Sequence, residues 1–303
     1  MHLGNSIICP VTGIPMIVLA GITAYISYKK AKKDIKKENI TLISSLTMLV
    51  FAMQMINFSI PQTGSSGHII GAVLLSAILG PYIGYIAMCI ILLIQAIFFA
   101  DGGLLALGCN IFNMAFLTCF IVYPYIYKPL ADKNKLIPAA IISSIASLQL
   151  GSLAVVIEAK LSGSISNNIS YFLSLMQTIH LPIGIIEGIF TALIILLIKK
   201  YELSNKLNYI FYSISIVLAS IISQYASNKP DGLEWSLLKI SDSFMELTQG
   251  IIFSFSTYLQ GKFAVLININ SILANTIGIF IIMIIMLIIK KTICYEVIRK
   301  DEK

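Results

Sequence analysis

The feature that most constrains the fold of this chain is a series of long apolar stretches separated by short charged segments. These stretches are about 17 to 25 residues long, and a helix of roughly 20 apolar residues crosses the hydrocarbon core of a bilayer. The 303 residues are 57% hydrophobic and only 12% charged, which excludes a soluble globular domain. The sequence therefore predicts an all-α, polytopic membrane bundle.

We expect about nine transmembrane helices, some of them short. Their expected ranges are 11–28, 41–57, 67–80, 82–100, 104–125, 137–158, 181–198, 208–225 and 270–289. A polar external segment at about 226–268 separates the last two helices, and a short polar stretch at 201–206 precedes them. We therefore predict a membrane domain at 1–202 and a second domain at 203–303, consisting of two helices and an external loop.

Basic residues predict the orientation of the bundle. Most of the 21 Lys and Arg residues follow the first, fifth, seventh or ninth expected helix, which places them on one side of the membrane. Cytoplasmic loops carry the excess of Lys and Arg, so we expect the N-terminus outside and the C-terminus in the cytoplasm. Because the net charge of +7 arises at helix ends, we do not interpret it as a nucleic-acid-binding surface.

Two of the three histidines are expected on the outer face, His2 beside the N-terminus and His68 after the Gly64-Ser65-Ser66-Gly67 loop. The Met1 amine, the amide nitrogen of His2 and its Nδ1 can chelate one transition metal ion through fused rings. The His68 imidazole can fill the remaining equatorial position. Four nitrogens in a plane favour Ni(II) or Cu(II) and allow Co(II). Alternatively, His2 is a solvated terminal residue and His68 lies beside a helix cap.

The residues around His68 have expected supporting roles. Ser65 and Ser66 can cap a helix beginning near Gly67 or hydrogen-bond a ligand imidazole. Gln54 and Asn57 end the second helix at the same outer face, so we expect them to orient loops near the site.

A second polar group lies on either side of the turn Asp101-Gly102-Gly103. Gln95 precedes the turn, and Asn110 and Asn113 follow it three residues apart, on one helix face. Polar side chains inside a bilayer usually face the bundle interior. We expect hydrogen bonds between helices or a supporting role around the ion.

His180 and Glu187 are seven residues apart, on one face of a helix that we expect to begin at Pro182. An intramembrane carboxylate suggests a function, whereas a role in helix packing is the alternative. One rival hypothesis is an intramembrane metal-dependent enzyme that uses this pair and an open, water-accessible metal position. A passive metal channel is another, but it needs several weak sites along a path. The chain has no phosphate-binding Gly-x-x-x-x-Gly-Lys-[Ser/Thr] motif, so energy for uphill transport has to come from partners.

In combination, these motifs resemble the CbiM/NikM family, the substrate-binding membrane subunits of cobalt/nickel energy-coupling-factor transporters. Pro230-Asp231-Gly232-Leu233-Glu234 resembles the PDGLE domain, a relative of the accessory CbiN/NikN subunits. Leu3-Gly4-Asn5-Ser6 departs from the family's usual Met-His-Ile-x-x-Gly start, which leaves the preferred metal open. The motifs that carry the resemblance are Met1-His2, Gln54 to Phe58, Gly64 to His68, Gln95-Ala96, Phe99 to Leu104, Leu107-Gly108, Asn110, His180, Ile183-Gly184 and Glu187-Gly188.

The resemblance implies that Met1, His2 and His68 hold Ni(II) or Co(II) in an outward-facing pocket. It also implies a transmembrane coupling subunit and two cytoplasmic ATPases as partners, in the cytoplasmic (inner) membrane of a prokaryote. The ion is then the substrate, the chain has no resident cofactor, and ATP hydrolysis resides in the partners. The second domain is expected to assist metal loading, and its Asp231 and Glu234 could attract cations or form a solvated surface.

Overall fold

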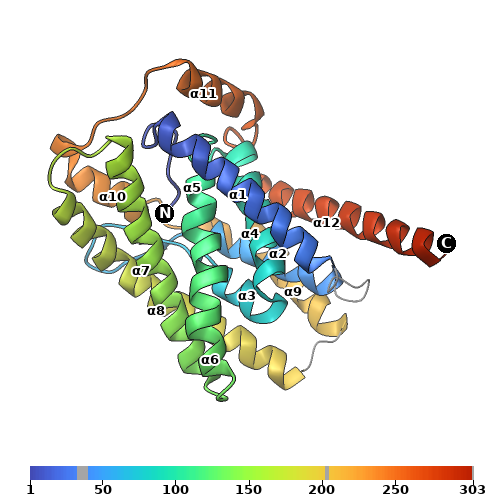
Figure 1. Cartoon of the computed structure of the whole chain (residues 1–303). Helices are drawn as coiled ribbons and strands as arrows, with labels where there is room; N and C mark the ends of the chain where they lie inside the picture. Colours follow the sequence, from blue (N-terminus) through green and yellow to red (C-terminus); the bar gives the residue numbers. More distant parts are fainter. Residues whose placement is uncertain (33–39, 202–204, 302–303) are drawn as a thin grey trace.

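The computed structural model describes residues 1–32, 40–201 and 205–301. The expected domain boundary at 202/203 and the basic residues Lys33, Lys36, Lys37 and Lys303 lie outside the described residues. The chain is mainly helical (Figure 1). Its helices in the first two thirds are α1 (Pro10–Ala31), α2 (Ile40–Gln54), α3 (Ala72–Leu79), α4 (Pro81–Ile94), α5 (Leu107–Ile111), α6 (Lys128–Ala131), α7 (Leu136–Ser162) and α8 (Ile169–Tyr201). The last third forms α9 (Asn205–Ser220), α10 (Gly232–Lys239), α11 (Ile251–Phe263) and α12 (Ser271–Asp301).

Two π-helical segments extend these α-helices. The π-type segment η1 (Gln95–Phe99) continues α4, and η2 (Phe112–Tyr127) joins α5 to α6 without a break. Two short 3₁₀ turns, η3 (Ile222–Tyr225) and η4 (Ser241–Ser243), flank α10. Inside a bilayer no water is available to hydrogen-bond the backbone N–H and C=O groups. Continuous helices pair these groups within the chain, as a membrane-embedded segment requires.

Six helical stretches of the described chain are long and apolar enough to cross a bilayer. They are α1, α4 with η1, α5 through α6, α7, α8, and residues 271–289 of α12. All nine predicted apolar segments coincide with helices, but α2, α3 and α9 have only 15, 8 and 16 residues. A helix of 16 residues spans about 24 Å, less than the ~30 Å of a typical hydrocarbon core. Nine full crossings therefore stay a prediction.

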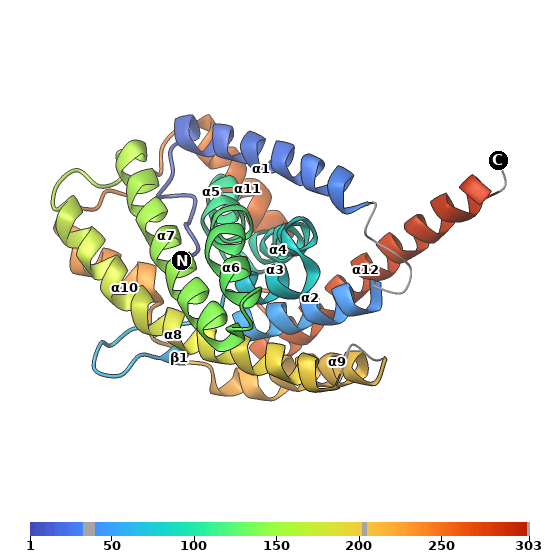
Figure 2. The same cartoon turned by 60° about the horizontal axis from the view of Figure 1, so that its bottom comes forward.

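The helices pack around two apolar cores. The larger core lies between α2, α3 and α4 and includes Phe51, Leu74 and Tyr85, which are fully buried. The smaller core joins the N-terminal segment to α7, α8 and α10, through Leu3, Phe172 and Leu233 among others. The N-terminus lies inside the bundle in both views (Figures 1 and 2). The second core thus anchors the first residues of the chain within the protein.

Close backbone contact holds α1 against α5. A Cβ atom on Gly108 of α5 would lie 2.2 Å from the backbone nitrogen of Ile17 on α1. Only glycine fits at this crossing, so the sequence Leu107-Gly108 sets how closely the two helices approach. This contact places the start of α5, and with it Asn110, directly behind the N-terminal segment.

A two-stranded antiparallel ribbon interrupts the helical pattern. Strand β1 (Phe58–Ser59) pairs with β2 (Ser66–Gly67), in the register Phe58 with Gly67 and Ser59 with Ser66. Helix α3 begins at Ala72, five residues later than the predicted start at residue 67, because the chain from β2 to Gly71 is extended or turned. Helix α8 likewise begins at Ile169, and Pro182 lies inside it, which corrects the predicted start at this proline.

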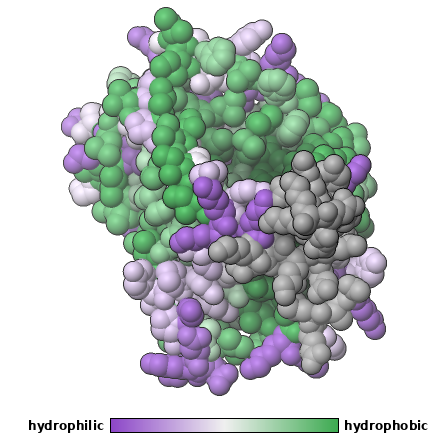
Figure 3. All heavy atoms as spheres, turned by 45° about the vertical axis from the view of Figure 1, so that its right-hand side comes forward, coloured by the Kyte–Doolittle hydropathy of each residue, from purple (hydrophilic) through white to green (hydrophobic). Residues whose placement is uncertain are grey.

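The molecular surface is apolar over large areas. Figure 3 shows hydrophobic residues over much of one face, with hydrophilic residues gathered most densely at its lower edge. On α1 and α8, large apolar side chains such as Val11, Ile22 and Leu193 are more than half exposed. Such continuous apolar surface requires a lipid environment, so the structure is that of a multi-pass membrane protein.

Candidate metal-binding site

The N-terminal segment lies buried in the bundle instead of extending into solvent. Only 3% of the Met1 surface is exposed, and Leu3 is fully buried. The Asn110 side chain accepts from the Leu3 amide at 2.8 Å and donates to the Leu3 carbonyl at 3.1 Å. Both backbone groups of Leu3 are therefore paired, as they would be in a β-sheet. The amide of Gly103 donates to the same carbonyl at 2.8 Å. His2 is thus held between Met1 and a firmly bound residue.

The loop that carries His68 is fixed from the opposite side. The Glu187 carboxylate accepts from the amides of Ile70 at 2.7 Å and Gly71 at 3.1 Å. Gln54 donates to the Ile70 carbonyl at 2.6 Å, and Gln95 donates to Gln54 at 2.8 Å. Gly71 has a φ of 75°, a conformation that glycine adopts without strain. These polar groups, all inside the bundle, set the position of the His68 backbone.

The two histidines meet between these supports. Their imidazole rings are stacked, with centroids 5.2 Å apart and an interplanar angle of 13°. Nδ1 of His2 lies 3.1 Å from a carboxylate oxygen of Asp101, whereas its Nε2 is buried and has no hydrogen-bond partner in the described part of the chain. Nδ1 of His68 lies 3.3 Å from the Ile69 carbonyl oxygen. A proton on that Nδ1 leaves the lone pair on Nε2, the form in which histidine binds a metal.

Burial and the nearby N-terminal ammonium keep both imidazoles neutral. Burial and, to a smaller extent, the charge of the ammonium group together lower the pKa of His2 to about 3 and that of His68 to about 4. Near neutral pH both rings therefore carry a free nitrogen lone pair. A metal ion binding there would release no net proton from either imidazole, although binding at His2 Nδ1 requires the ring proton that faces Asp101 to move to Nε2.

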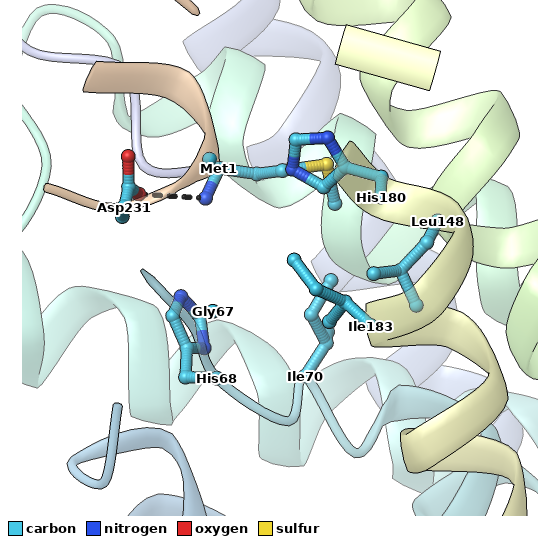
Figure 4. Close-up of a pocket in the computed structure, with 9 residues that line it drawn as sticks. Met1, Gly67, His68, Ile70, Leu148, His180, Ile183 and Asp231 are labelled. Carbon is cyan, nitrogen blue, oxygen red and sulfur yellow. Dashed lines mark hydrogen bonds and ion pairs between the residues drawn. The ribbon is translucent and has the colours of Figure 1, made fainter. Parts of the chain in front are cut away.

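The Met1 amine faces the second domain (Figure 4). It lies 3.1 Å from a carboxylate oxygen of Asp231. Burial alone would raise the pKa of Asp231, but the adjacent ammonium holds it below its usual range. A cavity of about 10 Å³ lies beside the pair and is lined by His68 and His180, among others. For His180 a structural or coupling role is expected, and its Nδ1 lies 2.7 Å from the Met176 carbonyl oxygen, within its own helix.

The two serines of the loop do not have the expected capping role. Gly71 precedes α3, and no side chain caps this helix start. The Ser65 hydroxyl donates to the Ser66 carbonyl at 3.1 Å, and the Ser66 hydroxyl donates to the Lys229 carbonyl at 2.7 Å. The Ser66 amide also donates to the Pro230 carbonyl at 2.8 Å. Ser66 therefore joins the His68 loop to the second domain.

The remaining predicted residues separate into those near the site and those away from it. Asn57 contributes its backbone carbonyl, which accepts from the Ser227 amide at 2.7 Å. Asn113 donates to Glu158 on α7 at 2.6 Å, as expected of a hydrogen bond between helices. Glu158 itself is only 5% exposed. Asp101 contacts His2, so its loop belongs to the site.

Two residues of the second domain, Asp231 and Gln260, make contacts that the sequence did not predict. Asp231 bonds the N-terminal amine, and Gln260 on α11 accepts from Asn5 at 2.8 Å and donates to the Gly102 carbonyl at 2.7 Å. The only sequence signal was the capping pattern Asp231-x-x-Glu234, which predicts a helix start and not its partner. Among the described residues, no group of three or more His, Cys, Asp or Glu side chains is placed to hold a metal ion. The candidate site therefore depends on backbone nitrogen as well as imidazole.

The apolar helices define a polytopic membrane protein. Its buried N-terminus and two stacked imidazoles form a candidate site for a metal ion bound through nitrogen atoms. Residues 2–204 match the family model described as the cobalt uptake substrate-specific transmembrane region, CbiM. Residues 205–294 match the PDGLE domain. The chain belongs to the CbiM family and carries a fused PDGLE domain.

Individual relatives and a solved structure agree with this assignment. The chain is 34% identical over 182 residues to an Archaeoglobus fulgidus protein named as a fused nickel transport protein, NikMN, covering 60% of this chain and 59% of that relative. It is 33% identical over 204 residues to the cobalt transport protein CbiM of Thermosipho melanesiensis, covering 65% and 83%. A crystal structure of a transition metal transporter matches with a TM-score of 0.60 and 28% identity, covering 71% of this chain and 99% of that one.

Proposed function

We propose that this protein captures Ni(II) or Co(II) outside the cell and is the substrate-specific subunit for uptake of that ion. The ligands are the Met1 amine, the His2 amide nitrogen and Nδ1, and an imidazole nitrogen of His68. The observation that carries the proposal is the stacking of two buried, neutral imidazoles beside a buried N-terminus. An arriving ion would replace the contact between His2 Nδ1 and Asp101.

The names of relatives support the same class of substrate, since one is named for nickel and another for cobalt transport. Four nitrogen donors suit either ion. The structure favours capture over catalysis, because the cavity beside His68 and His180 has room for roughly one water molecule. An enzyme would need space for a second substrate next to the metal.

The transport cycle requires partners. We propose that the chain works in the cytoplasmic membrane of a prokaryote with a transmembrane coupling subunit and two cytoplasmic ATPases, as an energy-coupling-factor transporter. In this proposal α10 and α11 lie on the outer side of the membrane. The opposite side is the cytoplasmic side, because basic residues are frequent at the helix ends that lie toward it, the C-terminal ends of α1, α6, α8 and α12 (Figure 1). Residues 1–202 form the metal-binding domain and 203–303 the accessory domain.

Uptake of radioactive nickel or cobalt into cells that express the chain with its coupling and ATPase subunits tests this function. We expect energy-dependent accumulation that is lost in His68→Ala at equal expression. Accumulation by His68→Ala at the rate of the unmodified chain would refute the proposed site. Accumulation of neither metal by the complete set of subunits would refute the proposed function.

A further inference from the structure

The carboxylate of Asp231 lies between two partners at the junction of the domains. Its Oδ1 accepts from the Glu234 amide at 2.8 Å, and Glu234 in return accepts from the Asp231 amide at 3.1 Å, which forms a complete capping box at the start of α10. Its Oδ2 lies 3.1 Å from the Met1 nitrogen. The cap holds the carboxylate rigidly, so the second oxygen is directed at the amine.

Other contacts make this arrangement a property of the domain interface. The Asp231 backbone pairs with Ser66, two residues before His68, as a parallel bridge. A Cβ on Gly232 would lie 3.1 Å from the His180 ring, so α10 begins in close contact with α8. Farther along, the Leu247 amide donates to the Ser6 carbonyl at 2.7 Å, and Gln260 binds Asn5. The second domain thus holds both the N-terminal segment and the His68 loop.

We propose that Asp231 is a positioning residue of the metal site, which holds the N-terminal amine where it can bind the ion together with His2 and His68. This inference rests on the proposed function, and it assigns the PDGLE motif a role other than attracting cations. A primary amine that binds a metal ion retains two N–H groups, so it can still donate a hydrogen bond to Asp231. Groups that orient a ligand in this way typically contribute about 10- to 100-fold to metal affinity.

The alternative is that Asp231 only caps α10, and two substitutions separate the roles. Asp231→Ser keeps a capping side chain but is too short to reach the amine, whereas Asp231→Ala removes both interactions. Glu234→Gln is the matched control, since glutamine also completes a capping box and does not touch the amine. Asp231→Asn, which keeps the cap and the side-chain length but loses the charge, serves as a further variant if the serine protein folds poorly.

Two measurements on purified full-length protein test the proposal. The first is titration with Ni(II) or Co(II). We expect Asp231→Ser and Asp231→Ala to bind about 10- to 100-fold more weakly, and Glu234→Gln to bind like the unmodified chain. The second is acylation of the Met1 amine in ion-free protein, quantified on the N-terminal peptide by mass spectrometry. The serine and alanine variants should react faster than the unmodified protein.

Unchanged affinity in Asp231→Ser, or weak binding in Asp231→Ala alone, would show that Asp231 acts only as a helix cap and would overturn the inference. Equal acylation rates in all four proteins would do the same. If the unmodified chain binds neither ion, the proposed function fails instead. The acylation rates then still decide whether Asp231 holds the amine.

Discussion

At the scale of single residues, Glu187 is the support on which the His68 loop depends. Both of its carboxylate oxygens accept backbone amides, from Ile70 and Gly71, and only 1% of its surface is exposed. Buried amides without a partner are costly, and charged acceptors make stronger bonds than neutral ones. Glu187 therefore contributes to the site through the loop and not as a ligand.

Replacing Glu187 with alanine should leave two buried amides unpaired, at about 1–3 kcal/mol each. We expect a lower thermal midpoint in detergent and weaker Ni(II) binding, with Glu187→Gln in between because its amide oxygen still accepts one bond. Glu246→Ala, at an exposed position, is the control. If Glu187→Ala melts and binds like the control, the loop is held by other contacts.

The neutral histidines predict how stability depends on pH. His2 and His68 have pKa values of about 3 and about 4 in the folded protein because they are buried, below the ordinary value of 6.5. Between the folded and the unfolded pKa values, the unfolded chain binds more protons than the folded protein. The free energy of unfolding therefore decreases as the pH falls from about 6.5 toward 4. Thermal midpoints of ion-free protein from pH 7.5 to 5 should fall less in His68→Asn. Parallel curves would contradict the buried, neutral state of His68.

Some of the site could be predicted at this scale. The chelating pattern of Met1-His2 and the expected outer position of both histidines predict that the two side chains meet, and the structure brings their rings together. The roles of Ser65 and Ser66 could not be predicted. Ser65 donates to the adjacent Ser66 carbonyl, whereas local pattern favours a bond to the following helix start. Ser66 depends on a partner, Pro230, that lies 164 residues away. The contact between Asp231 and the amine has the same cause.

At the scale of helices, the crossing of α1 and α5 depends on Gly108. A methyl group there would overlap the backbone of α1, whereas a Cβ on Gly21 of α1 would have no atom within 4 Å. Gly108→Ala should destabilise the protein by about 1–3 kcal/mol through overpacking. Gly21→Ala should be neutral or slightly stabilising, because alanine favours helix. Thermal unfolding of the pair checks this, and equal midpoints would mean that the crossing tolerates a wider separation.

Helix positions were predicted better than helix ends. Each of the nine apolar segments lies on a helix, because continuous apolar sequence in a membrane favours helix regardless of its detailed composition. The predicted starts at residues 67 and 181 differ from the observed starts of α3 at Ala72 and α8 at Ile169 by 5 and 12 residues. For α3, hydrogen bonds to Glu187 hold the preceding backbone out of a helix, and for α8, a helix of 33 residues continues through Pro182.

At the scale of the whole molecule, the basic helix ends predict the orientation in the membrane. Cysteine substituted for the exposed Glu246 should react with an impermeant maleimide on intact cells, whereas cysteine at the exposed Lys133 should react only after permeabilisation. The chain without either substitution reports the background from its own cysteines. The reverse pattern would place the candidate site in the cytoplasm and contradict capture from outside.

The membrane class and the two-part organisation followed from hydropathy and the change of composition near residue 202. The packing of the second domain against the N-terminal segment could not be predicted in this way. It depends on single contacts between residues 230 or more positions apart, such as Met1 with Asp231. Sequence periodicity reports which face of an element is buried and not what covers it. A polar segment between two helices was therefore predicted as an external loop without a docking position.

The central claim is that the N-terminal amine is a metal ligand, and calorimetric titration with Ni(II) and Co(II) tests it most directly. The comparison needs three proteins with C-terminal tags only: the unmodified chain, shown by intact mass to begin at Met1, a form with one glycine added before Met1, and His68→Ala. We predict tight binding by the first protein and none measurable by the other two. Binding by the extended form with the affinity of the unmodified chain would contradict the claim.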